Sequence, residues 1–276
     1  MTDARAIARD YYDSEDADNF YSAVWGGEDI HIGLYGGDDI SIKDASRKTV
    51  LHMAGALAGL ASPGARVLDI GSGYGGAARV LADRFGAEVT CVNLSSVENE
   101  RNRQLNEAQG LSGLIDVVDG SFDDIPAADG VFDIVWSQDA ILHAPDRKAV
   151  LKEVARVLKP GGEFIFTDPM QADGLGDTAA LQPIYDRIHL KSLASPQFYS
   201  RELEALGFTP VRIEEMTDEL QTHYARVRAQ LQKQRGHLAG EVSKDYIDRM
   251  LDGLGHWVDG ARKGLLYWGV MYFRKN

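Results

Sequence analysis

The stretch ARVLDIGSGYGGAARVLADRFGAEVTCVNLS, residues 65–95, decides the fold. A short apolar run (66–71) leads into four glycines within six residues, followed by a segment with helical spacing (76–85) and a second apolar run (87–94). Glycine adopts backbone conformations that other residues avoid, and it lets a ligand approach the main chain closely. The pattern therefore predicts a strand, a ligand-binding turn, a helix and a second strand.

The rest of the chain continues this alternation. Strand-length apolar runs occupy residues 114–119, 131–137 and 163–168, and helical spacing occupies residues 96–109 and 146–158. Later we expect a helix (199–206), a strand (209–216), a helical region (218–260) and a final strand (264–274). Strands that alternate with helices form a doubly wound parallel sheet, whose ligand lies beyond the carboxyl ends of the strands. The predicted fold class is α/β.

Two parts of the chain fall outside this sheet pattern. Residues 1–60 precede it, and we expect them to form an N-terminal helical lid over the ligand cleft, with residues 61–276 as the main domain. The connection 170–198 is longer than a compact domain usually contains without a function. We therefore expect acceptor-binding insertions near 170–198 and 218–260.

Composition excludes several classes of protein. The 276 residues carry a net charge of −13, which argues against binding nucleic acid because that affinity depends on cationic contacts to phosphate. No apolar run of 18 or more residues is present, so no membrane span is expected. The start of the chain lacks a basic segment followed by a long apolar one, so a cytoplasmic location is expected.

Cysteine and histidine usage bears on metals and disulfides. The single cysteine, Cys91, excludes an internal disulfide, and its place inside an apolar run predicts a buried, inert thiol. The seven histidines are scattered without a metal-ligand spacing, so no metal is expected.

The glycine loop alone leaves two interpretations open. GSGYGG satisfies the dinucleotide fingerprint G-x-G-x-x-G with Gly71, Gly73 and Gly76, which would suit a nicotinamide-dependent oxidoreductase. That fingerprint also expects an acid about twenty residues later, whereas the second strand here ends in Asn93. A tight turn between strand and helix is the other interpretation.

Five motifs at the ends of successive strands narrow the choice: VLDIGSGYGG, VNLS, DGSFDDIP, FDIVWSQDAILHAPD and VLKPGGEFIFTDP. In this order they resemble the class I S-adenosylmethionine-dependent methyltransferases, a seven-stranded, Rossmann-like family with an antiparallel last strand. The resemblance covers residues 60–170 strongly, and GLLYWGVMYFRKN fits the last hairpin. It implies S-adenosylmethionine as cofactor. A nicotinamide-dependent oxidoreductase and a non-catalytic S-adenosylmethionine-binding sensor remain the alternatives from other classes.

The resemblance also implies a cofactor site, made of Asp69, Gly71, Gly73, Asn93, Leu94, Asp119, Ser121, Phe122 and Ser137. Asp69 organises the loop, and the two glycines let backbone approach the methionine part of the cofactor. Asn93 stands where the family usually has an acid for the ribose hydroxyls, and an amide both accepts and donates hydrogen bonds. Ser121 and Phe122 are expected at the adenine, with Asp119 as a substitute carboxylate; Phe122 is equally compatible with the core.

Two stretches narrow the choice of methyl acceptor: the start of the chain, YYD…NFY…WGGEDIHIGLY, and the motif WSQDAILHAPD. These residues resemble the sarcosine/dimethylglycine N-methyltransferases of glycine betaine synthesis, which implies a small amine substrate with a carboxylate. The phosphoethanolamine methyltransferases and cyclopropane fatty-acid synthases share parts of the motifs, so a phosphoethanolamine-type or other small-molecule methyltransferase is the alternative. An osmolyte enzyme fits the acidic surface. The oligomeric state, monomer or dimer, stays open.

Amine chemistry defines what the acceptor site must contain. An amine with a pKa of about 10 is mostly protonated at neutral pH and cannot attack until it loses a proton. Aromatic faces stabilise such cations, and Tyr11, Tyr12, Tyr21 and Trp25 are concentrated in the expected lid. His143, just past the fourth strand, is a candidate to accept or orient the proton.

The phosphoethanolamine relatives add a partner for this histidine. They pair the histidine of the same motif with an N-terminal tyrosine, which Tyr12 or its neighbour Tyr11 matches here. Asp139 is expected to hold the ammonium, and Gln138 to donate or accept a hydrogen bond to the substrate. Structural roles, as a helix cap or a core histidine, are the alternatives for these residues.

A carboxylate on the acceptor calls for arginine, whose planar group matches it. Arg187 in the 170–198 connection is the first choice, with His189 and Tyr199 nearby. Arg47 and Lys48 in the N-terminal region are the alternatives.

Overall fold

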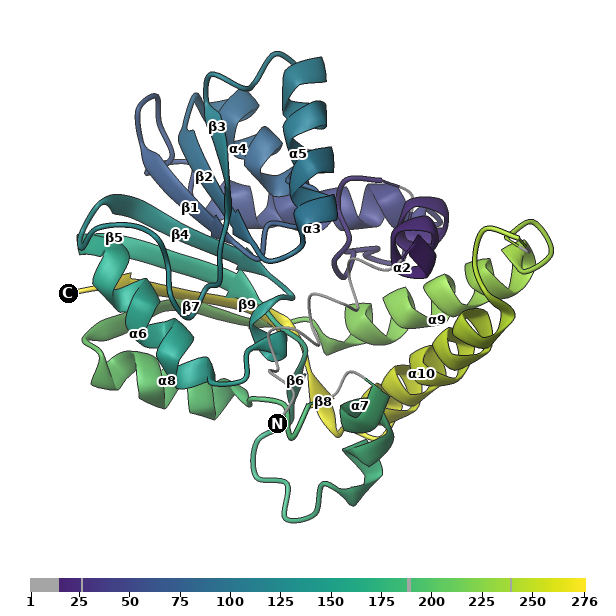
Figure 1. The fold of residues 1–276 in the computed structure, drawn as a ribbon. Coiled ribbons are helices and arrows are strands. Elements are labelled where there is room, and N and C mark those ends of the chain that lie inside the picture. The colour runs from purple at the N-terminus through teal and green to yellow at the C-terminus, as the bar shows by residue number, and fades with distance from the viewer. Residues whose placement is uncertain (1–14, 26, 188–189, 239) are drawn as a thin grey trace.

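The structure, a computed structural model, describes residues 15–25, 27–187, 190–238 and 240–276. A seven-stranded sheet lies between two layers of helices, and a long helical hairpin projects to one side of it (Figure 1). The strands of this sheet are β1 (Arg66–Ile70), β2 (Glu88–Asn93), β3 (Ile115–Asp119), β4 (Phe132–Gln138), β5 (Leu158–Thr167), β7 (Phe208–Glu215) and β9 (Gly269–Lys275).

The order of the strands is β3-β2-β1-β4-β5-β9-β7. Neighbours from β3 to β5 are parallel, whereas β9 is antiparallel to both β5 and β7. This is a doubly wound sheet in which the last strand of the chain is antiparallel. The predicted fold class is confirmed.

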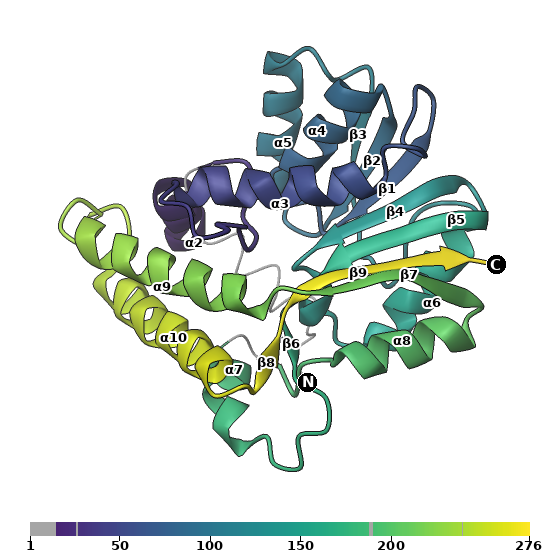
Figure 2. The same ribbon diagram turned by 180° about the vertical axis from the view of Figure 1, so that it is seen from behind.

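Helices cover both faces of the sheet (Figures 1 and 2). One layer consists of α3 (Ile42–Ala56), α4 (Gly76–Phe85) and α5 (Ser96–Ala108), and the other contains α6 (Arg147–Val157) and α8 (Pro196–Ala205). Successive strand residues point to opposite faces, so Val67 of β1 joins the hydrophobic cluster under α3 and α4 and Leu68 joins the one under α6 and α8. Cys91 is fully buried as predicted, and burial raises the pKa of its thiol to about 12.

The glycine loop brings the end of β1 against the end of β4. Gly71 has φ +72°, and a Cβ added there would collide with the side chain of Ala140, which follows β4. Gly75 also has positive φ, at +76°, and caps the start of α4, where a Cβ would collide with Asn102. Only glycine fits both the backbone conformation and the contact at these positions. The loop therefore presents its main chain at the switch point between β1 and β4, where doubly wound sheets bind ligands.

The predicted helical region 218–260 is two antiparallel helices, α9 (Thr217–Gln234) and α10 (Lys244–Arg262). Ser243 breaks the region because its Oγ accepts the backbone N–H of Tyr246 at 3.3 Å and caps the start of α10. Apolar spacing indicates that residues are helical, but only a capping residue such as Ser243 shows where one helix ends and the next begins. The two helices form the hairpin that projects from the sheet.

The connection after β5 contains more structure than predicted. It holds β6 (Met170–Gln171), a short 3-10 turn (Ala179–Leu181) and α7 (Gln182–Arg187). β6 pairs with β8 (Leu266–Tyr267), so the predicted final strand 264–274 is broken at Trp268, and only β9 joins the main sheet. α8 begins at Pro196, three residues earlier than predicted, because proline fits the first turn and Ser195 caps it.

The N-terminal segment packs on the helical hairpin. It contains α2 (Glu15–Phe20), a turn of π-helix, η1 (Tyr21–Trp25), and an extended stretch (27–41) that leads into α3. The side chain of Asn19 donates to the carbonyl of Glu241 at 2.8 Å, beside the hairpin tip. The extended stretch crosses the carboxyl end of β4, where the N–H of Ile32 donates to Asp139 Oδ2 at 2.7 Å. Within the described ranges, no helix is both long and apolar enough to cross a membrane.

Tyr199, predicted as a substrate contact, is instead a core residue. It is 0% exposed, packs against Phe166, and its hydroxyl donates to Asp168 Oδ2 at 2.6 Å. The amphipathic spacing of α8 turns this position inward, away from both cavities described below. The predicted role of Tyr199 is therefore wrong.

Replacing Tyr199 with Phe should weaken the fold and leave substrate binding alone. The change removes the donor to the buried carboxyl of Asp168, which costs about 1–3 kcal/mol when such a group is left without its partner. Urea unfolding should show that loss, while the KM for the acceptor stays within about twofold. A large rise in KM without a loss of stability would indicate that Tyr199 contacts the substrate after all.

Candidate active site

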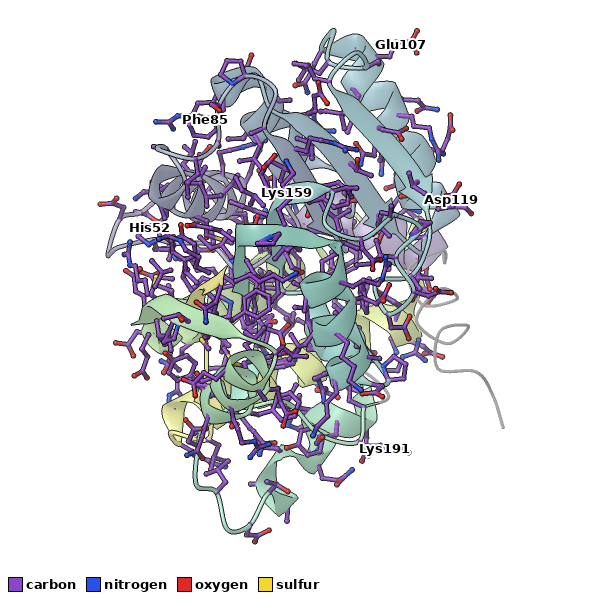
Figure 3. The ribbon with its side chains drawn as sticks, turned by 90° about the vertical axis from the view of Figure 1, so that its left-hand side faces the viewer. His52, Phe85, Glu107, Asp119, Lys159 and Lys191 are labelled. Carbon is purple, nitrogen blue, oxygen red and sulfur yellow. The ribbon has the colours of Figure 1, made fainter. Side chains whose placement is uncertain are left out.

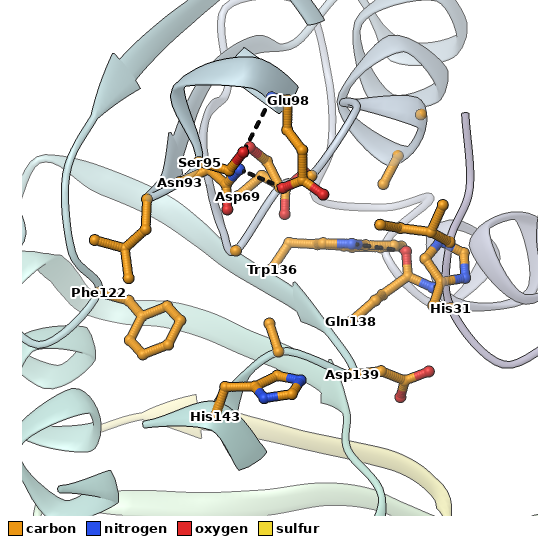
Figure 4. Close-up of a pocket in the computed structure, with 18 of the residues that line it drawn as sticks. His31, Asp69, Asn93, Ser95, Glu98, Phe122, Trp136, Gln138, Asp139 and His143 are labelled. Atoms are coloured by element: carbon orange, nitrogen blue, oxygen red, sulfur yellow. Dashed lines mark hydrogen bonds between the residues drawn. The ribbon is translucent and has the colours of Figure 1, made fainter. Parts of the chain in front are cut away.

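A cavity opens at the carboxyl ends of β1, β2 and β4, beside the glycine loop (Figure 4). Nearly all of the predicted cofactor residues line it. Those brought together there are Asp69, Gly71, Gly73, Asn93, Leu94, Ser121 and Phe122, and the predicted acceptor residues Gln138, Asp139 and His143 line it too.

Asp69 ends up as a buried carboxyl at the base of the glycine loop. It is 2% exposed, and burial raises its pKa to about 7; nearby Asp29 adds to this rise, whereas Arg79 opposes it. A carboxyl in such a place favours a cationic or hydrogen-bonding ligand group over water. This fits the position predicted for the amino-acid part of the cofactor.

An acid that was not predicted, Glu98, lies beside the end of β2. Asn93 donates through Nδ2 to Glu98 Oε2 at 2.8 Å, and Glu98, only 4% exposed, lines the same cavity from the first turn of α5. Ser95 Oγ accepts the N–H of Glu98 at 3.1 Å, so the spacing S-x-x-E (95–98) was a visible capping signal. The cavity therefore has a carboxyl beside the end of β2, contributed by the first turn of the following helix.

Asp119 and Ser137, both predicted at the cofactor, lie elsewhere. Asp119 is at the outer edge of the molecule (Figure 3), 61% exposed, and accepts hydrogen bonds from Asn99 (2.6 Å) and Arg103 (3.2 Å). Ser137 is fully buried, and its hydroxyl donates to the carbonyl of Ile70 at 2.9 Å, joining β4 to β1. The two predictions are wrong because local hydrogen bonds hold the side chains away from the cavity.

A second cavity adjoins the first. Its walls are strongly aromatic, with Tyr21, Trp25, Tyr224 and Trp257, and the rings of Tyr224 and Trp257 stack at 5.2 Å. The two cavities share four lining residues, which are Ile30, His31, Asp139 and His143. The two cavities therefore adjoin at these four residues, which we call the junction.

Asp139 occupies the junction in an unusual backbone conformation. Its φ is +51°, which is rare for a residue other than glycine and is typical of functional sites. Its carboxylate accepts the N–H of Ile32 at 2.7 Å and the indole N–H of Trp268 at 2.8 Å. Burial raises the pKa of Asp139, and a charge on nearby His31 would oppose this rise.

Arg187 lines the second cavity, as predicted for the acceptor carboxylate. It ends α7, and its Nη2 lies 2.8 Å from the sulfur of Met250 on α10. The two alternative cations are engaged elsewhere. Arg47 pairs with Asp29 at 2.8 Å, and Lys48 pairs with Asp38 at 2.9 Å on the surface.

Three predicted site residues, Tyr11, Tyr12 and His189, lie outside the described residues, so their roles remain predictions. Five other site residues were not predicted. The missed residues are His31, Glu98, Tyr224, Met250 and Trp257. Those on α9 and α10 show only the apolar spacing of a packed helix, which does not distinguish a cavity wall from core. In the described part of the chain, no cluster of three or more His, Cys, Asp or Glu side chains is arranged to hold a metal.

Replacing Glu98 with Ala should weaken cofactor binding. The change removes the buried carboxylate of α5 that lies beside the end of β2, and it leaves the Asn93 amide without this partner. A hydrogen bond to a charged group contributes about 1.5–3 kcal/mol, so the affinity for S-adenosylhomocysteine should fall about 10- to 100-fold in calorimetry. The matched control is Asp119→Ala, which removes an exposed acid and should leave affinity unchanged. Equal losses in the two variants would contradict the assignment.

Comparison with known proteins shows the family. Residues 68–166 match a methyltransferase domain. The chain is 56% identical over 269 residues to the sarcosine/dimethylglycine N-methyltransferase of Halorhodospira halochloris, covering 98% of this chain and 96% of that protein. It is 46% identical to the sarcosine/dimethylglycine N-methyltransferase of Aphanothece halophytica, with both chains fully covered.

A solved structure agrees with this result. The crystal structure of a Galdieria sulphuraria protein, proposed to be a sarcosine dimethylglycine methyltransferase, superposes with a TM-score of 0.91 at 44% identity. The match covers 96% of this chain and 99% of that one. These likenesses confirm the resemblance predicted from the strand-end motifs and exclude the nicotinamide-dependent oxidoreductase. The chain belongs to the sarcosine/dimethylglycine N-methyltransferase family of S-adenosylmethionine-dependent methyltransferases.

Proposed function

We propose that this protein transfers methyl groups from S-adenosylmethionine to the nitrogen of sarcosine and of N,N-dimethylglycine, with glycine betaine as the last product. The observation that carries this proposal is the second cavity. It has aromatic walls and one arginine, and it meets the cofactor cavity at the junction. The names of the relatives point to the same substrates.

The cofactor cavity suits S-adenosylmethionine. In the proposal, Asp69 and the glycine loop hold the amino-acid part, Glu98 and Asn93 hold the ribose, and Phe122 covers the adenine. The bound cofactor supplies a methyl group on a positively charged sulfur. With these contacts the methyl group would face the junction, because the junction is where the cofactor cavity meets the acceptor cavity.

The second cavity suits a small amino acid with a methylated nitrogen. Aromatic faces attract the cationic nitrogen and its methyl groups, and the Arg187 guanidinium pairs with the carboxylate. Trp25 is held in place because its indole N–H donates to the carbonyl of His31 at 3.2 Å. Fixing both ends of the substrate points the nitrogen at the junction.

The reaction is an in-line displacement that depends on positioning. The lone pair of the acceptor nitrogen forms the new N–C bond while the S–C bond breaks. The electron pair of the broken S–C bond stays on sulfur, which becomes neutral. Holding both reactants in line removes most of the entropic barrier to a bimolecular step. Methylation must end at glycine betaine because a quaternary nitrogen has no lone pair.

Incubation with labelled S-adenosylmethionine and a panel of acceptors tests the proposal. The panel contains glycine, sarcosine, N,N-dimethylglycine and phosphoethanolamine. We expect transfer to sarcosine and N,N-dimethylglycine, with labelled glycine betaine as the final product. Transfer to phosphoethanolamine alone would overturn the substrate assignment and leave the fold and the cofactor unchanged.

Replacing Arg187 with Ala should weaken substrate binding selectively. Loss of a charge-assisted contact to the carboxylate should raise the KM for N,N-dimethylglycine about 10- to 100-fold, with S-adenosylmethionine affinity nearly unchanged. Arg262→Ala on α10, where the side chain is 66% exposed, is the matched control. Wild-type kinetics in the Arg187 variant would remove this assignment.

Gly253→Ala displaces the same guanidinium without removing its charge. A Cβ at this helix position would collide with Cδ and Nε of Arg187, so the arginine side chain has to shift. Alanine is a better helix former than glycine, so α10 should remain folded. Steady-state kinetics should therefore show a raised KM for N,N-dimethylglycine in a stable protein, whereas an unchanged KM would indicate that the position of Arg187 is unimportant.

The N-terminal lid is also a proposal, and hydrogen exchange tests it. Residues 28, 30 and 31 line the cofactor cavity, and Ile32 is bonded to Asp139. If the segment closes over the cofactor, amides in residues 27–41 should exchange more slowly when S-adenosylhomocysteine is added. Unchanged exchange there, alongside protection of the glycine loop, would show that the segment does not respond to the cofactor.

A further inference from the structure

Two histidines meet at the junction of the cavities. His31 reaches it from the N-terminal segment and His143 from the turn after β4, and both line both cavities. The proposed reaction needs a group that takes a proton from the acceptor ammonium before the nitrogen attacks. The surroundings of the two imidazoles differ in the property that matters for this task, which is how well each accommodates a positive charge.

Hydrogen bonds fix the tautomer of His31. The indole N–H of Trp136 only donates, and it donates to Oε1 of Gln138 at 3.1 Å. The amide nitrogen of Gln138 therefore faces His31 Nδ1, at 3.4 Å, and donates to it. Nδ1 then carries the lone pair and Nε2 carries the hydrogen. Figure 4 shows Gln138 beside His31 on the wall of the cavity.

The protonated side of His31 faces a carboxylate. Nε2 lies 3.9 Å from Asp29 Oδ1, which is buried and accepts no hydrogen bond within the described part of the chain. The second oxygen of Asp29 is held by Arg47 at 2.8 Å. Asp139, also at the junction, favours a positive charge on His31. An imidazolium at His31 would thus have carboxylates on two sides.

The charges around His143 have the opposite effect. Its pKa is lowered to about 4, first by burial and then by the positive charges of Arg147 on α6 and Arg187 on α7. The pKa of His31 is also lowered to about 4 by burial, but there Asp139 acts in the opposite direction. Both rings are neutral at pH 7, and nearby carboxylates would stabilise a cation at His31.

We propose that His31 is the catalytic residue that accepts the proton of the acceptor ammonium, with Asp29 as the residue that positions it. This rests on the proposed amine acceptor. The incoming N–H takes the place of the Gln138 amide, whose 3.4 Å contact is long for a hydrogen bond. The substrate N–H bond breaks, an Nδ1–H bond forms, and the electron pair stays on the substrate nitrogen for the attack. The proton later leaves to solvent.

Charged and titratable groups on every packed element bear on this step. Those facing His31 are Asp29 on the same segment, Arg47 on α3, Asp139 after β4 and His223 on α9. Arg47 opposes protonation of His31, and Asp139 favours it. Asp29 lies 3.9 Å from Nε2, and burial raises the pKa of its own carboxyl to about 6, so it is ionised at pH 7. His223 is itself neutral at working pH, because burial lowers its pKa to about 3.

The test compares three histidine-to-glutamine variants with N,N-dimethylglycine as acceptor. In His31→Gln we expect kcat/KM at pH 7 to fall about 100-fold or more, as for removal of a general base. The loss should shrink by about tenfold per pH unit toward the amine pKa of about 10, because the enzyme then captures free amine. S-adenosylhomocysteine affinity should stay within about threefold. His52→Gln, on the outer side of α3 (Figure 3), should behave as wild type.

A second variant, Asp29→Asn, tests the same assignment if His31→Gln does not fold. It should reduce kcat/KM about tenfold with the same recovery at high pH, because it removes the carboxylate that stabilises the imidazolium. His143→Gln should show a loss that is independent of pH, since its role at the junction does not involve the proton.

Three outcomes would overturn the assignment. They are a wild-type pH profile in His31→Gln, a loss that pH does not relieve, and a pH-relieved loss in His143→Gln instead. Failure of the proposed substrate is distinguishable from all three. If the wild type methylates a different amine, the same comparison is made on that amine; if it methylates no amine, the proposed function fails and the proton assignment falls with it.

Discussion

The carboxylate of Asp139 joins the three parts of the chain that surround the junction. Asp139 directly follows β4, accepts the N–H of Ile32 from the N-terminal segment, and accepts the indole N–H of Trp268 from the break between β8 and β9. Its left-handed backbone costs on the order of 1–3 kcal/mol, and hydrogen bonds to a charged group, at about 1.5–3 kcal/mol each, offset that cost. Both cavities depend on this contact because their shared wall is built from the segments it holds.

Burial determines the protonation states of the titratable side chains around this contact. Burial lowers the pKa of His31 and His143 to about 4, whereas it raises the pKa of Asp69 and Asp168 to about 7. The histidines stabilise the fold above their unfolded pKa of about 6.5 and lose this contribution as the pH falls toward 4. The carboxyls contribute below about 3.8 and lose their contribution as the pH rises to about 7. The two dependences oppose each other, and at neutral pH the histidines of the site add no positive charge beside a cationic sulfur or product.

Local sequence patterns predicted the sheet well. They also predicted those site residues that lie close in sequence to the end of a strand. The glycine loop, Asp69, Asn93 and Phe122 lie at or just after the carboxyl ends of strands, so strand order brought them together. Glu98 was missed because one helical turn separates it from the strand end that it serves. Ser137 was wrongly assigned because a strand residue one position from the end points into the sheet and bonds to Ile70 instead. No local pattern predicts Trp257 or His31 at the site, since tertiary packing alone places them there.

The sheet and the segments outside it therefore have different tasks. β1, β2 and β4 end in the cofactor cavity, and their geometry follows from the doubly wound fold. Half of the residues that line the second cavity come from η1, α7, α9 and α10, none of which the fold requires. A fold of this kind supports many reactions, and function resides in what is added to it. Aromatic rings and one arginine are carried by those added segments, so changes there can alter the acceptor while the sheet continues to bind the same cofactor.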